Sequence, residues 1–182
     1  PLPPPPKRHL ALTAACGACG REALPDLGKL GLSPPPPLAV DPDLLLALPE
    51  RLGEAQRLFR ATGGLHAAAL FDREGRLVAL REDVGRHNAL DKLIGWAFLQ
   101  GKLPLHDHIL LVSGRAGYEL LVKAVAAGIP VFCAVSAPTS LAVALAQAYG
   151  LTLVGFLRPG RMNVYAGRER VGPPRGLPNP CG

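Results

Sequence analysis

Apolar residues recur at helical spacing in four segments of the chain, and each spacing predicts an amphipathic helix. The predicted helices cover residues 42–61, 86–98, 118–127 and 138–149. Asp41 followed by Pro42 is typical of a helix start, because a carboxylate accepts free amide hydrogens there and proline has no amide hydrogen to leave unpaired. Pro49 is expected to break or restart the first helix, since its ring clashes with the preceding turn.

Short apolar runs lie between these helices and predict strands. A polar turn separates residues 65–71 from residues 77–80, which predicts a β-hairpin. Further strands are expected at residues 109–112, 130–135, 151–156 and 163–165. Apolar strands that alternate with helices indicate an α/β fold in three layers, with a mixed, mostly parallel sheet.

The distribution of proline divides the chain of 182 residues into three parts. The chain contains 20 prolines and 21 glycines, yet only four of the prolines lie between residues 50 and 171. We therefore predict a proline-rich N-terminal segment over residues 1–40, an α/β domain over residues 41–171 and a flexible tail over residues 172–182. No apolar run is long enough to span a bilayer and no secretory signal pattern opens the chain, so a cytoplasmic protein without a membrane partner is expected.

Charge narrows the class of ligand. The chain has 20 Lys and Arg residues against 14 Asp and Glu residues, a formal net charge of +6. Basic side chains concentrate near the C-terminus, where only Glu169 opposes Arg158, Arg161, Arg168, Arg170 and Arg175. A positive patch there favours an anionic partner. Tyr165 is the one aromatic residue among these arginines, so the stacking surface of a single-strand groove is missing and no nucleic acid is expected as a partner.

Two loops that follow predicted strands are candidate anion sites. Ser113–Gly117 and Ser136–Ser140 each join a strand end to a helix start, where small residues and hydroxyls leave amide groups open to a phosphate. Arg115 adds a fixed positive charge. A tight turn is the alternative for the first loop, and an ordinary N-cap for the second. Neither loop is a Walker A sequence or a Gly-x-Gly-x-x-Gly fingerprint, so an NTPase or an NAD enzyme is not favoured.

Titratable side chains gather in residues 81–88, between a predicted strand and a predicted helix. His87 is a candidate for proton transfer, Arg86 for anion binding, and Glu82 or Asp83 for orienting either one. A solvated helix start is the alternative, because acidic residues there favour the helix dipole.

Three other histidines carry weaker signals. His66 lies among apolar residues and is expected to be a satisfied core histidine. His106 and His108 flank Asp107 in a loop, and exposed loop histidines seldom bind metal, so no metal site is predicted.

The Cys16-Gly17-Ala18-Cys19-Gly20 motif carries the clearest chemistry, because a thiolate is the nucleophile in sulfur exchange and a nearby second sulfur can act on the first. Half of a zinc site is one interpretation, with Cys133 and Cys181 as a weak second half. A thioredoxin-type motif is another, although proline-rich flanks do not suit its strand-to-helix junction. Acceptance of a sulfane sulfur as a persulfide is the third. A zinc deaminase is excluded, since its His-x-Glu precedes its Pro-Cys-x-x-Cys, whereas here the Cys-x-x-Cys comes first.

Together these motifs resemble the FdhD/NarQ family, the accessory sulfurtransferases of formate dehydrogenase. The matching segments occur in family order over residues 15–166 and are Cys16–Gly20, Thr62–His66, Glu82–Lys92, Ser113–Arg115 with Glu119, Ser136–Thr139 and Gly155–Tyr165. Several motifs in a consistent order are more specific than any one of them. Family members have a strand-rich region before the Cys-x-x-Cys, where this chain has residues 1–15.

The resemblance implies a cytidine-deaminase-like fold that lacks the zinc chemistry and forms a cytoplasmic homodimer with no tightly bound metal of its own. Sulfur would come from a cysteine desulfurase, with Cys16 as the persulfide carrier and Cys19 as its partner. It would pass to a molybdenum (or tungsten) bis-pterin guanine dinucleotide cofactor, held as a bound substrate by the domain of residues 41–171, and the sulfurated cofactor would go to formate dehydrogenase.

The resemblance also implies which residues bind that cofactor. The matching stretch is Phe156, Leu157, Arg158, Pro159, Gly160 and Arg161. Further candidates for its phosphates are Ser113, Arg115, Ser136 and Thr139. The alternative function is a carrier or chaperone that binds a pterin cofactor or a guanine nucleotide without sulfur transfer.

Overall fold

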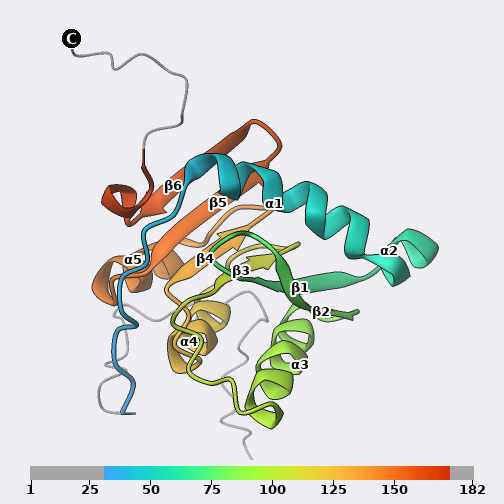
Figure 1. Cartoon of the computed structure of the whole chain (residues 1–182), viewed down its shortest axis with the longest axis horizontal. Coiled ribbons are helices and arrows are strands. Elements are labelled where there is room, and N and C mark those ends of the chain that lie inside the picture. Colours follow the sequence, from blue (N-terminus) through green and yellow to red (C-terminus); the bar gives the residue numbers. More distant parts are fainter. Residues whose placement is uncertain (1–30, 173–182) are drawn as a thin grey trace, which may run out of the picture.

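A computed structural model of the chain describes residues 31–172. In chain order its elements are α1 (Pro42–Ala55), α2 (Arg57–Thr62), β1 (His66–Phe71), β2 (Leu77–Asp83), α3 (Arg86–Leu99), β3 (Ile109–Val112), α4 (Tyr118–Ala126), β4 (Val131–Ala134), α5 (Ser140–Ala148), β5 (Thr152–Arg158), β6 (Arg161–Ala166) and the 3-10 helix η2 (Arg168–Arg170) (Figure 1). Every predicted strand and helix is present, and the first predicted helix is divided into α1 and α2.

The six strands form one mixed sheet in the order β2-β1-β3-β4-β5-β6. The central pairs β3–β4 and β4–β5 are parallel, whereas β1–β2, β1–β3 and β5–β6 are antiparallel. The α/β fold with a mixed sheet is therefore confirmed. Its parallel part is smaller than expected, because only the helical crossovers through α4 and α5 join neighbouring strands in parallel, while hairpins form both edges of the sheet.

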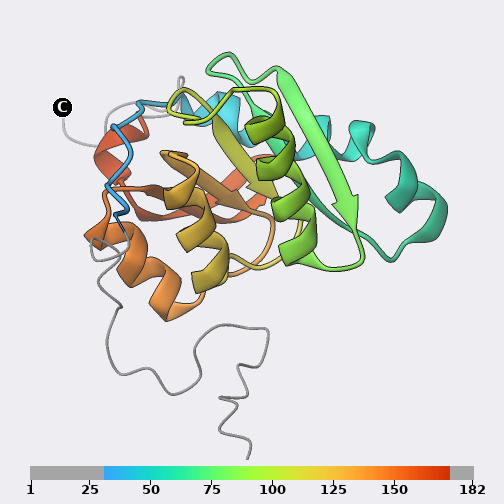
Figure 2. The same cartoon turned by 90° about the horizontal axis from the view of Figure 1, so that it is seen from below.

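Helices cover both faces of the sheet and make it the middle of three layers (Figure 2). On one face α3, α4 and α5 bury an apolar core that includes Leu90, Leu121 and Leu145, and on the other α1 buries a second core. Neighbouring residues of β3 serve the two cores in turn, since Leu110 packs in the first and Leu111 in the second. Covering of both faces explains why β3 and β4 are continuous apolar runs.

The helix α1 continues through Pro49, contrary to the expected break. Leu45, Leu48 and Leu52 are at most 2% exposed and pack along one side of α1 against the sheet. This burial stabilises the helix more than the missing amide hydrogen of proline weakens it. The chain departs from the helix only at Gln56, where φ is −74° and ψ is 80°.

The carboxyl ends of β2, β3, β4 and β5 lie at one edge of the sheet, and α3, α4 and α5 begin there. The loops after β3 and β4 run side by side at this edge. The Ala116 amide donates to the Ala137 carbonyl at 3.2 Å, and the Thr139 amide donates to the Ala116 carbonyl at 3.0 Å. The edge thus brings several helix N-termini together, which is where ligands collect in open α/β sheets.

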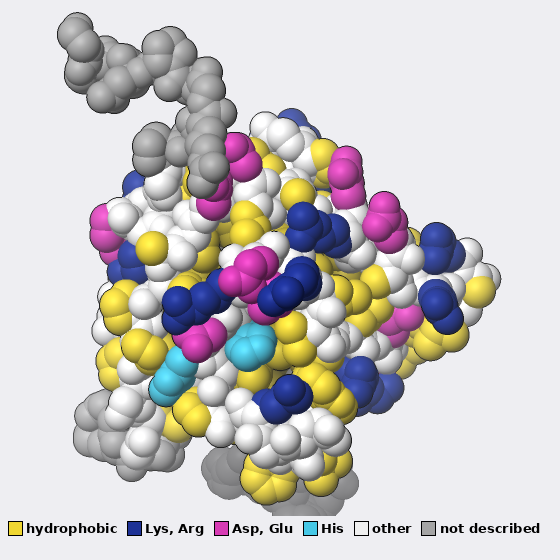
Figure 3. Space-filling model, viewed as in Figure 1, with side chains coloured by type: hydrophobic (Ala, Val, Ile, Leu, Met, Phe, Trp, Pro, Cys, Tyr) yellow, Lys and Arg dark blue, Asp and Glu magenta, His cyan; other side chains and the backbone are white. Residues whose placement is uncertain are grey.

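Acidic and basic side chains are interspersed on the face shown in Figure 3. Several of the surface charges are paired: Arg73 contacts Asp107, and Arg76 contacts both Asp72 and Glu74. Within residues 31–172, no helix combines the length and the apolar composition that a membrane span requires.

Candidate functional site

A cleft of about 530 Å³ opens at the carboxyl edge of the sheet. Its walls come from the end of α1 with α2, from the start of β1, and from the residues at the ends of β3, β4 and β5. Its lining residues include Gln56, Phe59, His66, Ser113, Leu157 and Arg158. None of the described residues that line the cleft is acidic, so its charge suits an anionic ligand.

Ser113 extends the sheet beyond the end of β3. Its amide donates to the Ala67 carbonyl at 3.0 Å, and its hydroxyl oxygen accepts the Ala67 amide hydrogen at 2.8 Å. A hydroxyl that accepts in this way still has its own hydrogen to donate. Because Ser113 is half-buried in the cleft wall, that hydrogen is placed to meet a ligand oxygen.

His66 is half-exposed at the start of β1 and lines the cleft, so the expected core histidine is wrong. Gly114, in the loop after β3, makes room for its ring. A β-carbon at residue 114 would lie 3.3 Å from His66 Nδ1 and 3.7 Å from Arg86 Cδ. The absent side chain therefore leaves room for the imidazole and for the stem of Arg86 beside Gly114, next to Ser113.

Arg158 holds a positive charge at the boundary between the cleft and a second cavity of about 330 Å³. Its guanidinium donates to the Val135 carbonyl and, at 3.0 Å, to the Leu157 carbonyl. These contacts use donors on one nitrogen and fix the side chain over the end of β4. A guanidinium has five N–H donors, so the rest remain for a ligand. This geometry suits phosphate or carboxylate recognition.

Phe156 reaches the second cavity through an irregularity in β5. The register with β6 shifts between Gly155 and Arg158, and Phe156 has a left-handed φ of 51°. Gly155 is required here because a β-carbon would lie 2.8 Å from Pro138 Cδ and 2.9 Å from Tyr165 Cε2. The result is a phenylalanine that is 43% exposed beside Arg158. A non-glycine residue with positive φ is costly, and such strain is often found at binding sites.

The structure brings most of the predicted cofactor residues to these cavities. Leu157 and Arg158 line the cleft with Ser113, while the second cavity is lined by Phe156, Arg158, Arg161, Met162 and Asn163. Gly160 lines a third cavity, and Pro159 lies exposed at the β5–β6 turn outside the linings of all three. Cys16 and Cys19 lie outside the described residues.

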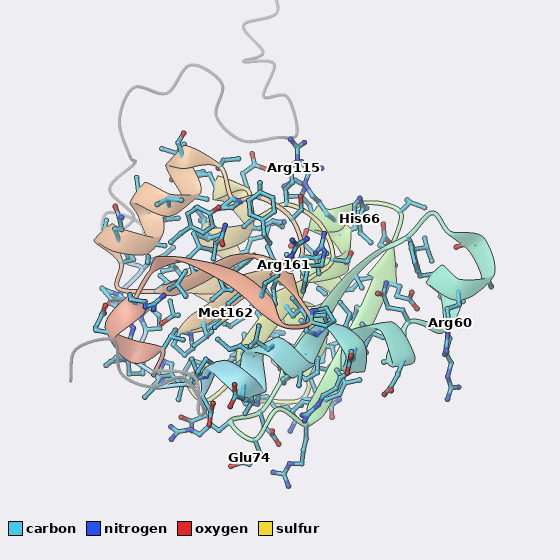
Figure 4. All side chains as sticks on the ribbon, turned by 90° about the horizontal axis from the view of Figure 1, so that it is seen from above. Arg60, His66, Glu74, Arg115, Arg161 and Met162 are labelled. Carbon is cyan, nitrogen blue, oxygen red and sulfur yellow. The ribbon has the colours of Figure 1, made fainter. Side chains whose placement is uncertain are left out.

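The other predicted phosphate contacts have mixed outcomes. Thr139 is the N-cap of α5, because its hydroxyl accepts the Ala142 amide hydrogen at 3.2 Å, as the N-cap alternative expects. Ser136 joins the loop after β4 to β5 through its carbonyl, which accepts the Phe156 amide at 3.1 Å. Arg115 is exposed, and it lies with His66 toward one edge of the molecule, opposite Glu74 (Figure 4).

The acidic residues among residues 81–88 make structural contacts with neighbouring elements. The Glu82 carboxylate accepts the amide hydrogens of Leu58 at 3.2 Å and Phe59 at 2.9 Å, so it caps α2. Asp83 contacts the Lys92 ammonium at 2.5 Å and accepts the Gly85 amide at 2.9 Å. The hydrogen bond from Lys92, with those from Gly85 and Asn88, lowers the pKa of Asp83 to about 2.

His87 joins the starts of two helices, since its Nε2 lies 3.2 Å from the Glu119 carboxylate on α4. Burial lowers the pKa of His87, and the neighbouring charge of Arg86 lowers it further. His87 and Arg86 do not line the cleft. His106 and His108 belong to no metal-binding group, and residues 31–172 contain no cluster of three or more His, Cys, Asp or Glu with that geometry.

The sequence patterns did not indicate that α1 and α2 form one wall of the cleft. Gln56 is 7% exposed, and Phe59 is 42% exposed on a short helix that buries none of its residues. The sequence held no signal for this wall, because Phe59 continues the apolar spacing of the predicted helix 42–61, and only the fold shows that α2 buries none of its residues.

Comparison with known proteins agrees with this architecture. The family model described as FdhD/NarQ family matches residues 4–172. The sulfur carrier protein FdhD of Streptomyces avermitilis is 57% identical over 168 residues, which cover 91% of this chain and 60% of that protein. The protein of the same name from Sulfurisphaera tokodaii is 50% identical over 164 residues, or 90% of this chain and 63% of that protein. The chain thus spans less than two thirds of the length of these curated relatives.

A solved structure gives the same result for the fold. A crystal structure of a protein named as a formate dehydrogenase accessory protein, from Desulfotalea psychrophila, matches with a TM-score of 0.70 and 31% identity, over 78% of this chain and 58% of that one. The family match extends from the N-terminal segment across the whole sheet to the residue after Val171, and it includes every wall of the cleft. This chain therefore belongs to the FdhD/NarQ family.

Proposed function

We propose that this chain, as a cytoplasmic homodimer, carries sulfur from a cysteine desulfurase to the molybdenum or tungsten bis-pterin guanine dinucleotide cofactor of formate dehydrogenase. The observation that carries the proposal is the cleft without acidic lining, where His66, Ser113 and Arg158 face one space. The chain also contains the Cys16-x-x-Cys19 motif, whose thiolates are nucleophiles that can accept and release a sulfane sulfur. Relatives named sulfur carrier protein support the sulfur part of the proposal.

Sulfur uptake in this proposal exchanges one sulfur–sulfur bond for another. The Cys16 thiolate attacks the outer sulfur of a persulfide on the desulfurase, and the desulfurase cysteine leaves as a thiolate. No net oxidation or reduction takes place, because one persulfide replaces another.

Release of the sulfur uses the second cysteine. The Cys19 thiolate attacks the inner sulfur of the Cys16 persulfide, a Cys16–Cys19 bond forms, and the outer sulfur leaves as hydrosulfide with the electron pair of the broken bond. The two thiols supply the two electrons that reduce the sulfane sulfur. A thiol reductant then reopens the disulfide for the next cycle.

The cofactor enters this proposal as a substrate with flat rings and dinucleotide arms that carry phosphates. Arg158 and Arg161 supply charged donors to the phosphates, and the Ser113 hydroxyl supplies a neutral one. The exposed ring of Phe156 offers an aromatic face to a guanine or a pterin.

Two variants separate sulfur transfer from simple cofactor carriage. The full chain is incubated with a cysteine desulfurase and cysteine, and its mass is measured before and after a thiol reductant. We expect the wild type and Arg158→Ala to gain at least one sulfur atom, and Cys16→Ala to gain none. Cys133→Ala is the matched control, because Cys133 is fully buried and burial raises its thiol pKa.

The binding of GDP is measured on the same proteins. Arg158→Ala is expected to weaken it by about tenfold or more, and Cys16→Ala to leave it unchanged. Equal sulfur loading of Cys16→Ala and wild type would contradict the sulfur function and leave the carrier function as the better account.

A further inference from the structure

The short helix α2 is the part of the cleft wall with the fewest attachments to the rest of the protein. It buries none of its residues, and within residues 31–172 no helix or strand packs extensively against it. Figure 1 shows α2 at the outer end of the molecule, beyond the end of α1. A segment with few buried contacts and exposed hydrogen bonds moves at a low cost in free energy, and the lids of ligand sites are drawn from such segments.

Both ends of α2 have the backbone of a hinge. At Gln56 the chain leaves the α1 helix, with φ −74° and ψ 80°, before it turns into α2. Two glycines follow α2, and the first of them, Gly63, has a left-handed φ of 68°. A β-carbon on Gly63 would meet nothing within 4 Å, and one on Gly64 would meet only the Thr62 carbonyl, at 3.9 Å. Close packing therefore does not require this pair of glycines, and what they supply is backbone freedom.

The contacts that hold α2 in its position are few and exposed. The Glu82 carboxylate on β2 accepts the amide hydrogens of Leu58 at 3.2 Å and Phe59 at 2.9 Å. The Arg60 guanidinium donates to the Glu54 carbonyl at 2.8 Å, which joins α2 to the end of α1 next to the first hinge. Because these hydrogen bonds are exposed to solvent, water can replace them when α2 moves.

Phe59 is the side chain that gains contacts when α2 moves inward. It lines the cleft and is 42% exposed, whereas its neighbour Leu58 is not among the residues that line the cleft. Apolar residues line the cleft as well, among them Leu52, Leu65 and Leu157. Movement of α2 toward them would cover the phenyl ring against a bound ligand and exclude water from the cleft.

We infer that α2 is a lid over the cleft, which moves about hinges at Gln56 and Gly63–Gly64, is held open by Glu82 and closes with Phe59 over the bound ligand. The inference rests on the proposed function, because the ligand that closes the lid is the anionic cofactor proposed for this cleft. A ligand that contacts Phe59 binds the closed position more tightly than the open one, so its binding shifts the lid toward closure. Closure then retains the ligand until the lid opens.

The accessibility of an indole at position 59 tests for this movement. The chain has one tryptophan, so Phe59→Trp combined with Trp96→Phe makes position 59 the only source of indole fluorescence. GDP is the probe ligand, and acrylamide quenching measures the exposure of the indole to solvent. We expect saturating GDP to lower the quenching constant by about twofold or more, because the closed lid covers the ring. Leu58→Trp combined with Trp96→Phe is the matched control, and we expect GDP to leave its quenching unchanged.

The affinity for GDP, measured by calorimetry on full chains that retain Trp96, separates a lid from a fixed wall. If Glu82 holds a lid open, Glu82→Ala favours the closed position and tightens GDP binding by about threefold or more. If α2 is a fixed wall, the same substitution loosens a binding surface and weakens GDP binding. Glu50→Ala is the matched control, because Glu50 is an exposed carboxylate on α1 that does not line the cleft, and its affinity is expected to equal that of wild type.

Two kinds of failure are distinct in these experiments. The inference is overturned if GDP leaves quenching at position 59 unchanged, if quenching falls equally in the Leu58→Trp control, or if Glu82→Ala binds GDP no more tightly than wild type. In each of these cases GDP still binds, so the proposed function stands. No GDP binding by any of the proteins would contradict the cofactor part of the proposed function and the lid with it.

Discussion

Gly114 lies directly against the imidazole ring of His66, so close that a β-carbon at residue 114 would stand 3.3 Å from Nδ1 and 3.5 Å from Cε1. Gly114 does not adopt a left-handed backbone conformation, so what requires glycine here is space. The loop after β3 therefore holds His66 in the cleft wall by close packing. The short stretch of residues 113–114 therefore positions both His66 and Ser113.

Substitution of Gly114 by alanine is expected to displace His66 and to destabilise the protein by about 1 kcal/mol, because a tightly packed neighbour must move. Gly95→Ala is the matched control, since a β-carbon inside α3 at that position meets nothing within 4 Å. The control is expected to raise stability by about 0.5–1 kcal/mol, since glycine is a poor helix former. Urea denaturation of both variants checks this, and a Gly114→Ala protein as stable as wild type would contradict the packing argument.

The Glu82 carboxylate is expected to keep α2 in place at the cleft, because it accepts two amide hydrogens at the start of a helix that buries no side chain. Glu82→Ala should therefore increase hydrogen exchange in α2 and cost about 1 kcal/mol of stability. Glu50→Ala, on the exposed side of α1, is the matched control. Unchanged exchange in α2 after Glu82→Ala would show that other contacts hold this wall.

His87 is expected to make the fold less stable at acidic pH. Burial and the charge of Arg86 lower the pKa of His87 despite the opposing charges of Glu119 and Asp91, and Lys123 also lowers it. The unfolded chain then takes up a proton first, so stability is lost as the pH falls below about 6.5 toward the folded pKa.

Thermal unfolding at about pH 7.5 and about pH 5 tests this prediction. His87→Gln should lose less stability between the two pH values than wild type. Burial lowers the pKa of His108 as well, with the same sign of effect, but His108 is present in both proteins, so their difference reports on His87. Equal losses in the two proteins would contradict the prediction.

The helices and strands were predictable from the sequence where the spacing of apolar residues matches the burial of those residues in the folded protein. The apolar runs of β3 and β4 are buried on both faces, and an N-cap was expected in the loop before α5, where Thr139 caps the helix. Pro49 was misleading because its effect on the helix is local, whereas the burial of Leu45 and Leu48 against the sheet depends on tertiary packing.

The candidate site was predictable in its chemistry and less so in its membership. Arg158 and Ser113 lie at strand ends, where the α/β pattern places ligands, so both were predicted as site residues, and both line the cleft. His66 was assigned to the core because its neighbours in the sequence are apolar, but the start of a strand at the sheet edge leaves the first side chain half-exposed.

The most direct test of the account follows the sulfur atom itself. The full chain is loaded by a cysteine desulfurase from radiolabelled cysteine, separated from the desulfurase, and mixed with the purified bis-pterin guanine dinucleotide cofactor, and the label in the cofactor is counted. We predict transfer by wild type and by the control Arg57→Ala, since Arg57 is exposed on α2 and lines neither the cleft nor the second cavity. We predict no transfer by Cys16→Ala, and at least about tenfold less by Arg158→Ala despite normal loading. Label that stays on the wild-type chain, or that reaches the cofactor equally with Cys16→Ala, would contradict the account.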